Sequence, residues 1–315
     1  MSEIKIYNDR QSGWVFHYAH FMCDLVLPDI VQKVYEHDIC YRLNTEQQTI
    51  GNFKPLWEKI MGIKTIEISN EEFENKNIPL KISSRFENNK NKFGKKEINE
   101  FKKYIYKRFD IKPDYSYPEI ILIERGENKN LVNNDMKDKL LLNNKFALTT
   151  GKSRREIENI DLLKEHLSDV PYKCIMLEHM DIEEQIKYFY NAKIIIAAHG
   201  AAMSNLLFCR ENTIMIEIMC GNWEFFNIIS HETSIKHIKC VNNVDEIMKV
   251  FITEYEKYIY EQQNILNKIK IQNLNQTQIK KYNLKKNELN KKEIKINKLK
   301  MKINKKHKLH KLLFL

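Results

Sequence analysis

Apolar and polar positions follow two different periods along residues 119–260, and the combination predicts parallel β-α units. Four short, mainly apolar runs are typical of strands buried on both faces: 119–123, 174–177, 193–198 and 213–218; residues 234–240 are a fifth, more polar strand candidate. Four segments between or after them repeat apolar residues every three or four positions, as amphipathic helices do: 154–168, 181–191, 222–231 and 244–260. This alternation predicts a parallel sheet covered by helices on both faces.

The first 112 residues show the same alternation of strand and helix patterns, but less regularly. The same patterns predict helices and strands there: helices at 20–35, 53–61 and 96–108, and strands at 38–42 and 63–68. Pro113 and Pro118 bracket a polar segment of the kind that often marks a domain boundary. We therefore expect two α/β domains, 1–112 and 113–263, followed by a C-terminal tail, 264–315.

The tail carries the excess positive charge of the chain. Residues 264–315 contain 16 lysines and two acidic residues, so the chain's net charge of +10 leaves about −4 on the rest. A weak heptad runs through Tyr282, Leu289, Ile296 and Ile303, which predicts a basic, partly helical extension. Three interpretations stay open: nonspecific binding of nucleic acid or of an anionic membrane surface, a weak coiled coil, or a solvated segment without a partner. Sparse aromatic residues argue against specific nucleic-acid binding.

The overall composition limits the class of protein further. Apolar residues make up 43% of the chain, which excludes a fully disordered protein. No run of about 18 apolar residues occurs, and the first ten residues are polar, unlike a signal peptide. The six cysteines lack CxxC spacing, so we expect reduced thiols rather than a zinc site or disulfides, in a cytoplasmic protein.

The strongest chemical signal is the junction at residues 193–208. An apolar strand leads directly into His199, Gly200 and small residues that open a helix, with Ser204 and Asn205 beyond. Small side chains allow a ligand to approach the backbone, and the first N–H groups of a helix favour an anion. In open parallel sheets, ligands bind beyond the carboxyl ends of the strands. The junction therefore predicts a site for a phosphate-bearing ligand, although packing alone could also explain the glycine.

Four ordered motifs resemble those of glycosyltransferase family 61. The sequence HGAAMSNLLF at 199–208, followed by the strand ending near Glu217, is similar to the family's HGAGL-(S/T)-N-LLF signature. Residues 20–28 resemble its H-(F/W)-xx-D-xxx-P segment, 121–125 its strand ending in arginine, and 154–159 its R-x-I-x-N helix start. The resemblance covers roughly residues 13–245 and leaves the tail unmatched.

The resemblance implies a GT-B architecture, in which two Rossmann-like domains face a cleft. It implies transfer from a nucleotide-sugar donor, with a UDP-sugar expected, to a glycan or glycoprotein hydroxyl group. The chain contains no DxD triplet, which metal-dependent GT-A enzymes use to hold the donor's diphosphate through a cation. We therefore expect an inverting enzyme without a metal or other cofactor, in which cations of the chain hold the diphosphate.

Donor-binding candidates follow from the resemblance. Arg125, just past a strand end, is the first candidate for the diphosphate, and either Arg154 or Arg155 is the second. His199 is a candidate to bind the diphosphate or orient the donor, and Glu217 to bind ribose hydroxyls. A surface arginine, a core histidine and a salt-bridged glutamate are the structural alternatives. The remaining candidates are Gly200, Ala201, Ser204 and Asn205.

The catalytic base is expected on the first predicted helix. His20 and Asp24 are one turn apart and therefore share a face. An imidazole titrates near neutral pH and suits proton removal from the acceptor hydroxyl. Asp24 could orient His20 or act as the base itself, and His17 is a rival. A helix face packed against the other domain is the structural alternative.

Two departures from the family pattern favour a second hypothesis. Ala202 replaces the second glycine of the signature, and Arg210-Glu211-Asn212 replaces the usual Pro-Gly turn. Alanine does not readily adopt positive φ, so Ala202 must have an ordinary helical conformation if the loop is intact. The alternative is a non-catalytic α/β scaffold that acts through its basic tail.

Overall fold

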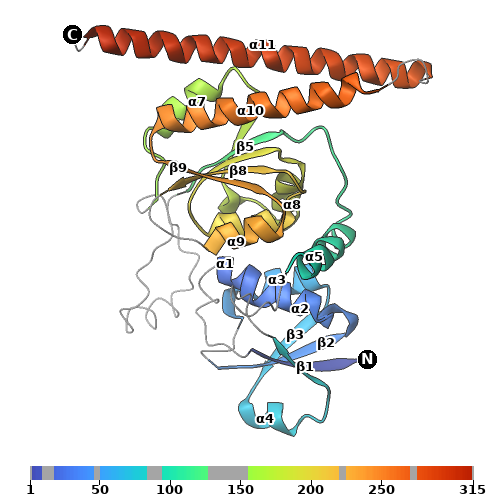
Figure 1. Cartoon of the computed structure of the whole chain (residues 1–315). Coiled ribbons are helices and arrows are strands. Elements are labelled where there is room, and N and C mark those ends of the chain that lie inside the picture. Colours follow the sequence, from blue (N-terminus) through green and yellow to red (C-terminus); the bar gives the residue numbers. More distant parts are fainter. Residues whose placement is uncertain are drawn as a thin grey trace.

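The computed structural model is an α/β structure with two parallel sheets (Figure 1). It describes residues 2–8, 18–45, 50–83, 94–126, 155–219, 225–269 and 275–313. The first sheet has the order β3-β2-β1-β4, with strands β1 Glu3–Asn8, β2 Ile39–Leu43, β3 Lys64–Ile68 and β4 Leu80–Ser83. The second has the order β6-β5-β7-β8-β9, with β5 Ile120–Ile123, β6 Tyr172–Ile175, β7 Ile194–Ala198, β8 Ile214–Met219 and β9 Lys236–Val241. Each strand of this second sheet runs parallel to its neighbours.

The first sheet packs against helices from the first part of the chain. An unbroken helical segment consists of α1 Tyr18–His20, the π-helical turns η2 Phe21–Val26, and α2 Leu27–Val31. The others are η3 Val34–Glu36, η4 Gly51–Phe53, α3 Lys54–Met61, α4 Asn70–Asn75 and α5 Lys95–Arg108.

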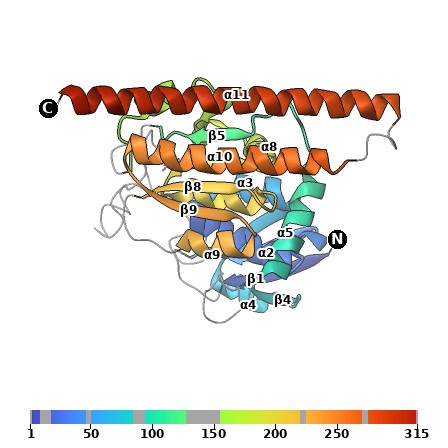
Figure 2. The same ribbon diagram turned by 45° about the horizontal axis from the view of Figure 1, so that its top comes forward.

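The second sheet lies between two helical layers (Figures 1 and 2). On the side toward the first sheet lie α8 Ile182–Asn191, the 3₁₀ helix η7 Ala201–Phe208 and α9 Phe225–Glu232. On the other side lie α7 Ile160–Leu167 and α10 Val244–Asn267, and α11 Gln276–Leu313 covers α10. A short 3₁₀ turn, η6 Leu177–His179, follows β6.

Two apolar cores result from the alternation of side chains along the strands. Along β7, Ile194 and Ile196 pack with α10, whereas Ile195 and Ala197 enter a core that also contains Ile4 of the first sheet. The core that contains Ile195, Ala197 and Ile4 is continuous between the two sheets. Helices join them as well: the Tyr106 hydroxyl donates to the Phe208 carbonyl at 3.0 Å.

Some predicted elements differ from the observed ones. Strands β1 and β4 were not expected, although Ile4 and Ile6 of β1 alternate with polar residues and are fully buried. The helix expected at 154–168 begins at Ile160, because Asn159 before it has φ of 51°, outside the right-handed helical region. The strand expected at 174–177 lies at Tyr172–Ile175.

Helix α11 packs on α10 through the residues of the predicted heptad. Tyr282, Leu289 and Ile296 are buried there, and so is Leu299. Lys292, a charged position in the heptad, is buried too, where it pairs with Glu119 just before β5. The tail residues therefore pack against the body through one side of the helix.

None of the helices in the described residues is long and apolar enough to cross a membrane. The cysteines that the structure describes are free thiols, as their spacing predicts: Cys23, Cys40, Cys174, Cys209 and Cys240.

Candidate functional site at the carboxyl ends of β5 and β7

Two of the predicted motifs meet where β5 and β7 end. The strands are neighbours in register, with Ile123 beside Ala197, so the residues that follow them emerge side by side. Arg125 follows β5, and His199 and Gly200 follow β7. Parallel pairing therefore brings together residues that are about 75 positions apart in the sequence.

Gly200 is required by the position of Arg125. The backbone of Gly200 is extended, with φ of 165°, so its φ alone would permit any residue. A Cβ atom added there would overlap Nη2 of Arg125 and lie 2.8 Å from its Cζ. The glycine thus lets the guanidinium group lie directly against the backbone where η7 begins.

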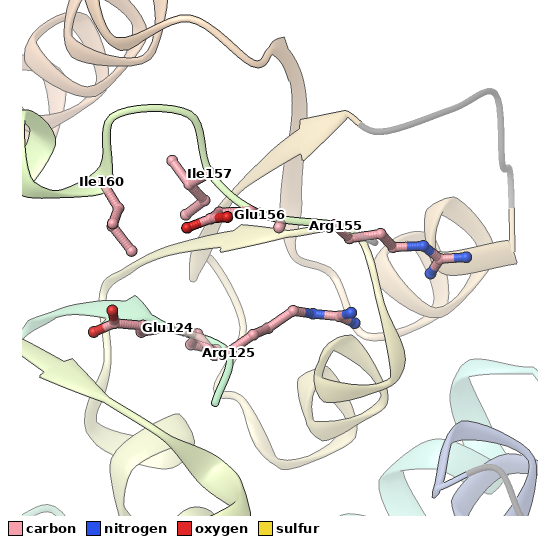
Figure 3. Close-up of a pocket in the computed structure, with 8 residues that line it drawn as sticks. Glu124, Arg125, Arg155, Glu156, Ile157 and Ile160 are labelled. Carbon is pink, nitrogen blue, oxygen red and sulfur yellow. The ribbon is translucent and has the colours of Figure 1, made fainter. Parts of the chain in front are cut away.

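A small pocket, open to solvent, lies beside this contact. Two guanidinium groups, those of Arg125 and Arg155, extend to one side of it, and Ile157 and Ile160 lie on the other side together with the carboxylates of Glu124 and Glu156 (Figure 3). Its lining is completed by Ile123 and Ala198. The pocket combines apolar side chains with two permanent cations, which suits a ligand that has an anionic and an apolar part.

Arg155 lies close to the same strand end. Its Nη1 is 3.4 Å from the carbonyl oxygen of His199, to which it donates. Of the two arginines that fit the family motif, Arg155 lines the pocket, and Arg154 lies outside the described residues. The carboxylate of Glu124 accepts from Lys164 at 2.8 Å, which offsets its negative charge beside the arginines.

Glu217 holds two buried histidines behind the strand ends. Its side chain is fully buried on β8; one oxygen contacts Nδ1 of His199, and the other lies 2.7 Å from Nε2 of His237. Burial raises the pKa of the Glu217 carboxyl group, but hydrogen bonds from the two histidines outweigh burial and lower it to about 2. The carboxylate is therefore ionised at neutral pH and fixes the ring orientation of His199.

His237 was not among the residues expected from the sequence. It lies on β9 beside Met215, and side chains in this register share a face with Glu217. Pairing β8 with β9 and applying the two-residue period could have found it. The alternative for Glu217, a salt bridge to lysine or arginine, is replaced by contacts with histidines.

Three further candidates on η7 make contacts within the fold. The Ser204 hydroxyl donates to the Ala201 carbonyl at 2.7 Å. The Asn205 amide donates to Gln185 at 2.8 Å, and its oxygen accepts from the Tyr18 hydroxyl at 2.7 Å. Ser204 and Asn205 are fully buried and do not line the pocket, so their contacts support η7 and its junction with α1.

The predicted His–Asp pair is formed. Nδ1 of His20 lies 2.8 Å from Oδ2 of Asp24, with the imidazole 35% exposed and the carboxylate buried. The Tyr18 contact places the start of this helix against η7. A buried carboxylate that orients a partly exposed imidazole is an arrangement suited to a general base. The rival residue, His17, lies outside the described residues.

Both departures from the family pattern are accommodated. Ala202 lies within η7 and is not among the residues with positive φ. Asn212 does have positive φ, 62°, in the turn before β8. Asparagine tolerates this left-handed conformation better than most residues, so it can replace the glycine of a Pro-Gly turn.

A pocket beyond the carboxyl ends of the strands of a parallel sheet is the usual place for a ligand in α/β proteins, and here it lies at the second sheet. Comparison with protein families gives a narrower class. The model of glycosyltransferase family 61 matches residues 18–216, and the chain belongs to that family. No curated protein matches the chain. Among the described residues, no group of three or more His, Cys, Asp or Glu side chains is arranged to hold a metal ion.

Proposed function

We propose that the chain transfers a sugar from a UDP-sugar donor to a hydroxyl group of a glycan or glycoprotein, with inversion at the anomeric carbon. Family membership supports glycosyl transfer. The observation that carries the donor assignment is the contact of Arg125 with Gly200, beside Arg155 and the apolar side chains of the pocket. Two guanidinium groups match the charge of a diphosphate, and Ile157 and Ile160 offer an apolar surface to the nucleoside.

In this proposal the pocket holds only part of the donor. The pocket is small and open to solvent, and small-molecule sites usually enclose more of their ligand. The diphosphate would lie at the guanidinium groups of Arg125 and Arg155, and the sugar would extend past them toward η7. Glu217 would hold the ring of His199 in one orientation, and His199 would act through this fixed position, without transferring a proton in the reaction.

Transfer would take place in one displacement. His20, oriented by Asp24, takes the proton of the acceptor hydroxyl, and the acceptor oxygen forms a bond to the anomeric carbon. The bond between that carbon and the β-phosphate oxygen breaks, and UDP leaves with the electron pair. Arg125 and Arg155 stabilise the charge that develops on the leaving diphosphate, so no divalent cation is needed.

We also propose that the two sheets correspond to the two lobes of a GT-B enzyme. The donor side is formed by β5–β9, and His20 would serve the acceptor from the first lobe. The contact of α1 with η7 supports this arrangement, since it brings the predicted base helix to the motif that follows β7. Ala202 does not have positive φ, so replacing the second glycine of the signature by alanine does not strain the loop and does not argue for an inactive scaffold.

The experiment measures UDP release from UDP-hexoses and UDP-pentoses by the purified chain, with EDTA present. We expect release from at least one donor, and a loss of about 10²-fold or more in Arg125→Ala, since a misplaced diphosphate slows transfer by that order. Arg108→Ala, which removes an exposed arginine from α5, is the matched control and should retain the rate. Equal rates in Arg125→Ala and the wild type would refute the donor assignment.

A further inference from the structure

The outer surface of α11 lies apart from the pocket, and none of the described residues that line the pocket belongs to this helix. We define this surface by four lysines and three apolar residues on the side of α11 that faces away from α10: Lys280, Lys291, Lys295, Lys298, Leu284, Ile294 and Met301. Most of these residues are spaced three, four or seven positions from another member, which places them on one side of a helix.

The apolar members are exposed to an unusual degree. Leu284 is 61% exposed, Ile294 56% and Met301 72%, although the opposite side of α11 buries Leu289 and Ile296 on the body. The helix therefore has two apolar faces, and packing within the chain uses only one of them. Leu284, Ile294 and Met301 lie on the same side of α11 as the four lysines, so the surface that faces away from the body is amphipathic.

The charge of the same surface is uniformly positive. The acidic residues of α11 are Glu288 and Glu293, and both are paired away from the outer lysines. Glu288 pairs with Lys292 at 2.6 Å, and Glu293 accepts from Gln263 of α10 at 2.9 Å. Nothing acidic thus lies among the four outer lysines, and an anionic partner would be attracted along the whole helix.

We propose that α11 docks the protein on an anionic lipid bilayer. Lysines attract anionic headgroups, and the apolar side chains between them enter the boundary between headgroups and acyl chains. A nucleic acid would satisfy the lysines but leave the apolar side chains in water. Nucleic-acid surfaces also favour arginine and exposed aromatic residues, and α11 contains no arginine and a single tyrosine, Tyr282, which is buried.

The shape of the molecule suits contact with a flat bilayer. A helix of 38 residues is about 57 Å long at 1.5 Å per residue, and α11 forms the outermost layer of the molecule (Figures 1 and 2). It can lie flat on a plane while the first sheet remains at the opposite end. The ion pair between the buried Lys292 and the partly buried Glu119 ties the helix to the start of β5 and so would hold the body in one orientation on the surface.

The test is co-sedimentation of the full chain with two kinds of vesicle, phosphatidylcholine alone and phosphatidylcholine mixed with phosphatidylglycerol, at low and high salt. We expect binding to the mixed vesicles alone, and weaker binding at high salt. Replacing Lys291, Lys295 and Lys298 together by glutamine should weaken it roughly a hundredfold, since each lysine near an anionic surface contributes about fivefold.

Two further variants make the test specific. The triple glutamine substitution of Lys96, Lys103 and Lys107 removes the same charge from exposed positions of α5 and should leave binding unchanged. Ile294→Ser with Met301→Ser keeps the charge and should weaken vesicle binding by roughly tenfold, because less apolar area is removed from water.

Four outcomes would overturn the proposal. The first is no binding by the folded wild type, and the second is equal binding to neutral vesicles. The third is an equal loss in the α5 control. The fourth is tighter binding to duplex DNA than to mixed vesicles, unchanged by the apolar variant.

Discussion

Gly200→Ala should impair donor binding without impairing the fold. The added Cβ would overlap Nη2 of Arg125 and lie 2.8 Å from Cζ, whereas ordinary contact begins near 3.4 Å. The guanidinium group must therefore move by at least about 0.6 Å at Cζ, and further at Nη2. Since the backbone is extended at φ of 165°, alanine itself is not strained, and we expect the stability to change by less than about 1 kcal/mol.

The displaced guanidinium group would lose or weaken its hydrogen bonds to the diphosphate. A hydrogen bond to a charged group contributes about 1.5–3 kcal/mol, which corresponds to a loss of roughly 10- to 150-fold in affinity. The assay is calorimetric titration with UDP in the presence of EDTA, for the wild type and the variant. Thermal unfolding of both proteins checks that the comparison is made on folded material.

A double-mutant cycle shows whether the effect acts through Arg125. In the Arg125→Ala background, Gly200→Ala has no guanidinium group to displace and should cause little further loss. Gly94→Ala is the matched control, because its added Cβ would meet only ordinary contacts at 3.7 Å or more. Wild-type affinity in Gly200→Ala, or an equal loss in both backgrounds, would refute the reasoning.

Three other predictions concern the buried carboxylate, the base and the tail. The folded pKa of Glu217, about 2, is below its usual value of 4.5, so the contribution of Glu217 to stability is present above about pH 4.5 and is lost as the pH falls toward 2. In Glu217→Gln the midpoint of chemical denaturation should therefore depend less on pH between about 4.5 and 2 than in the wild type. His20→Asn and Asp24→Asn should lower kcat by about 10²–10⁴-fold while leaving the calorimetric affinity for UDP unchanged, and a large loss of affinity would instead indicate a structural role. Leu289→Ala should destabilise the chain by about 2–5 kcal/mol in urea unfolding, and Leu284→Ala, at an exposed position, by less than about 0.5 kcal/mol; equal effects would contradict the packing of α11.

The second sheet could be predicted from the sequence because its central strands, β5, β7 and β8, are mainly apolar runs. The five strand candidates in residues 119–240 correspond to β5–β9, with a shift at β6. The first sheet was harder, since β4 is a short edge strand whose Leu80 and Ile82 are more than half exposed. An exposed edge strand lacks the burial that produces a strong hydrophobic pattern.

The candidate site was predictable residue by residue but not as a constellation. The motifs indicated Arg125 and Gly200 separately, whereas their contact depends on the register of β5 and β7, which no local pattern contains. Asn205 illustrates the opposite case, because a motif residue expected at the donor instead joins η7 to Tyr18. His237 escaped notice because its role depends on a partner 20 positions away on a neighbouring strand.

A crystal structure of the chain soaked with UDP, without added metal, tests the central claim most directly. We expect the diphosphate to lie within hydrogen-bond distance of the guanidinium groups of Arg125 and Arg155, and the nucleoside to lie against Ile157 and Ile160. UDP bound elsewhere, or bound at this place with its phosphates turned away from both arginines, would contradict it.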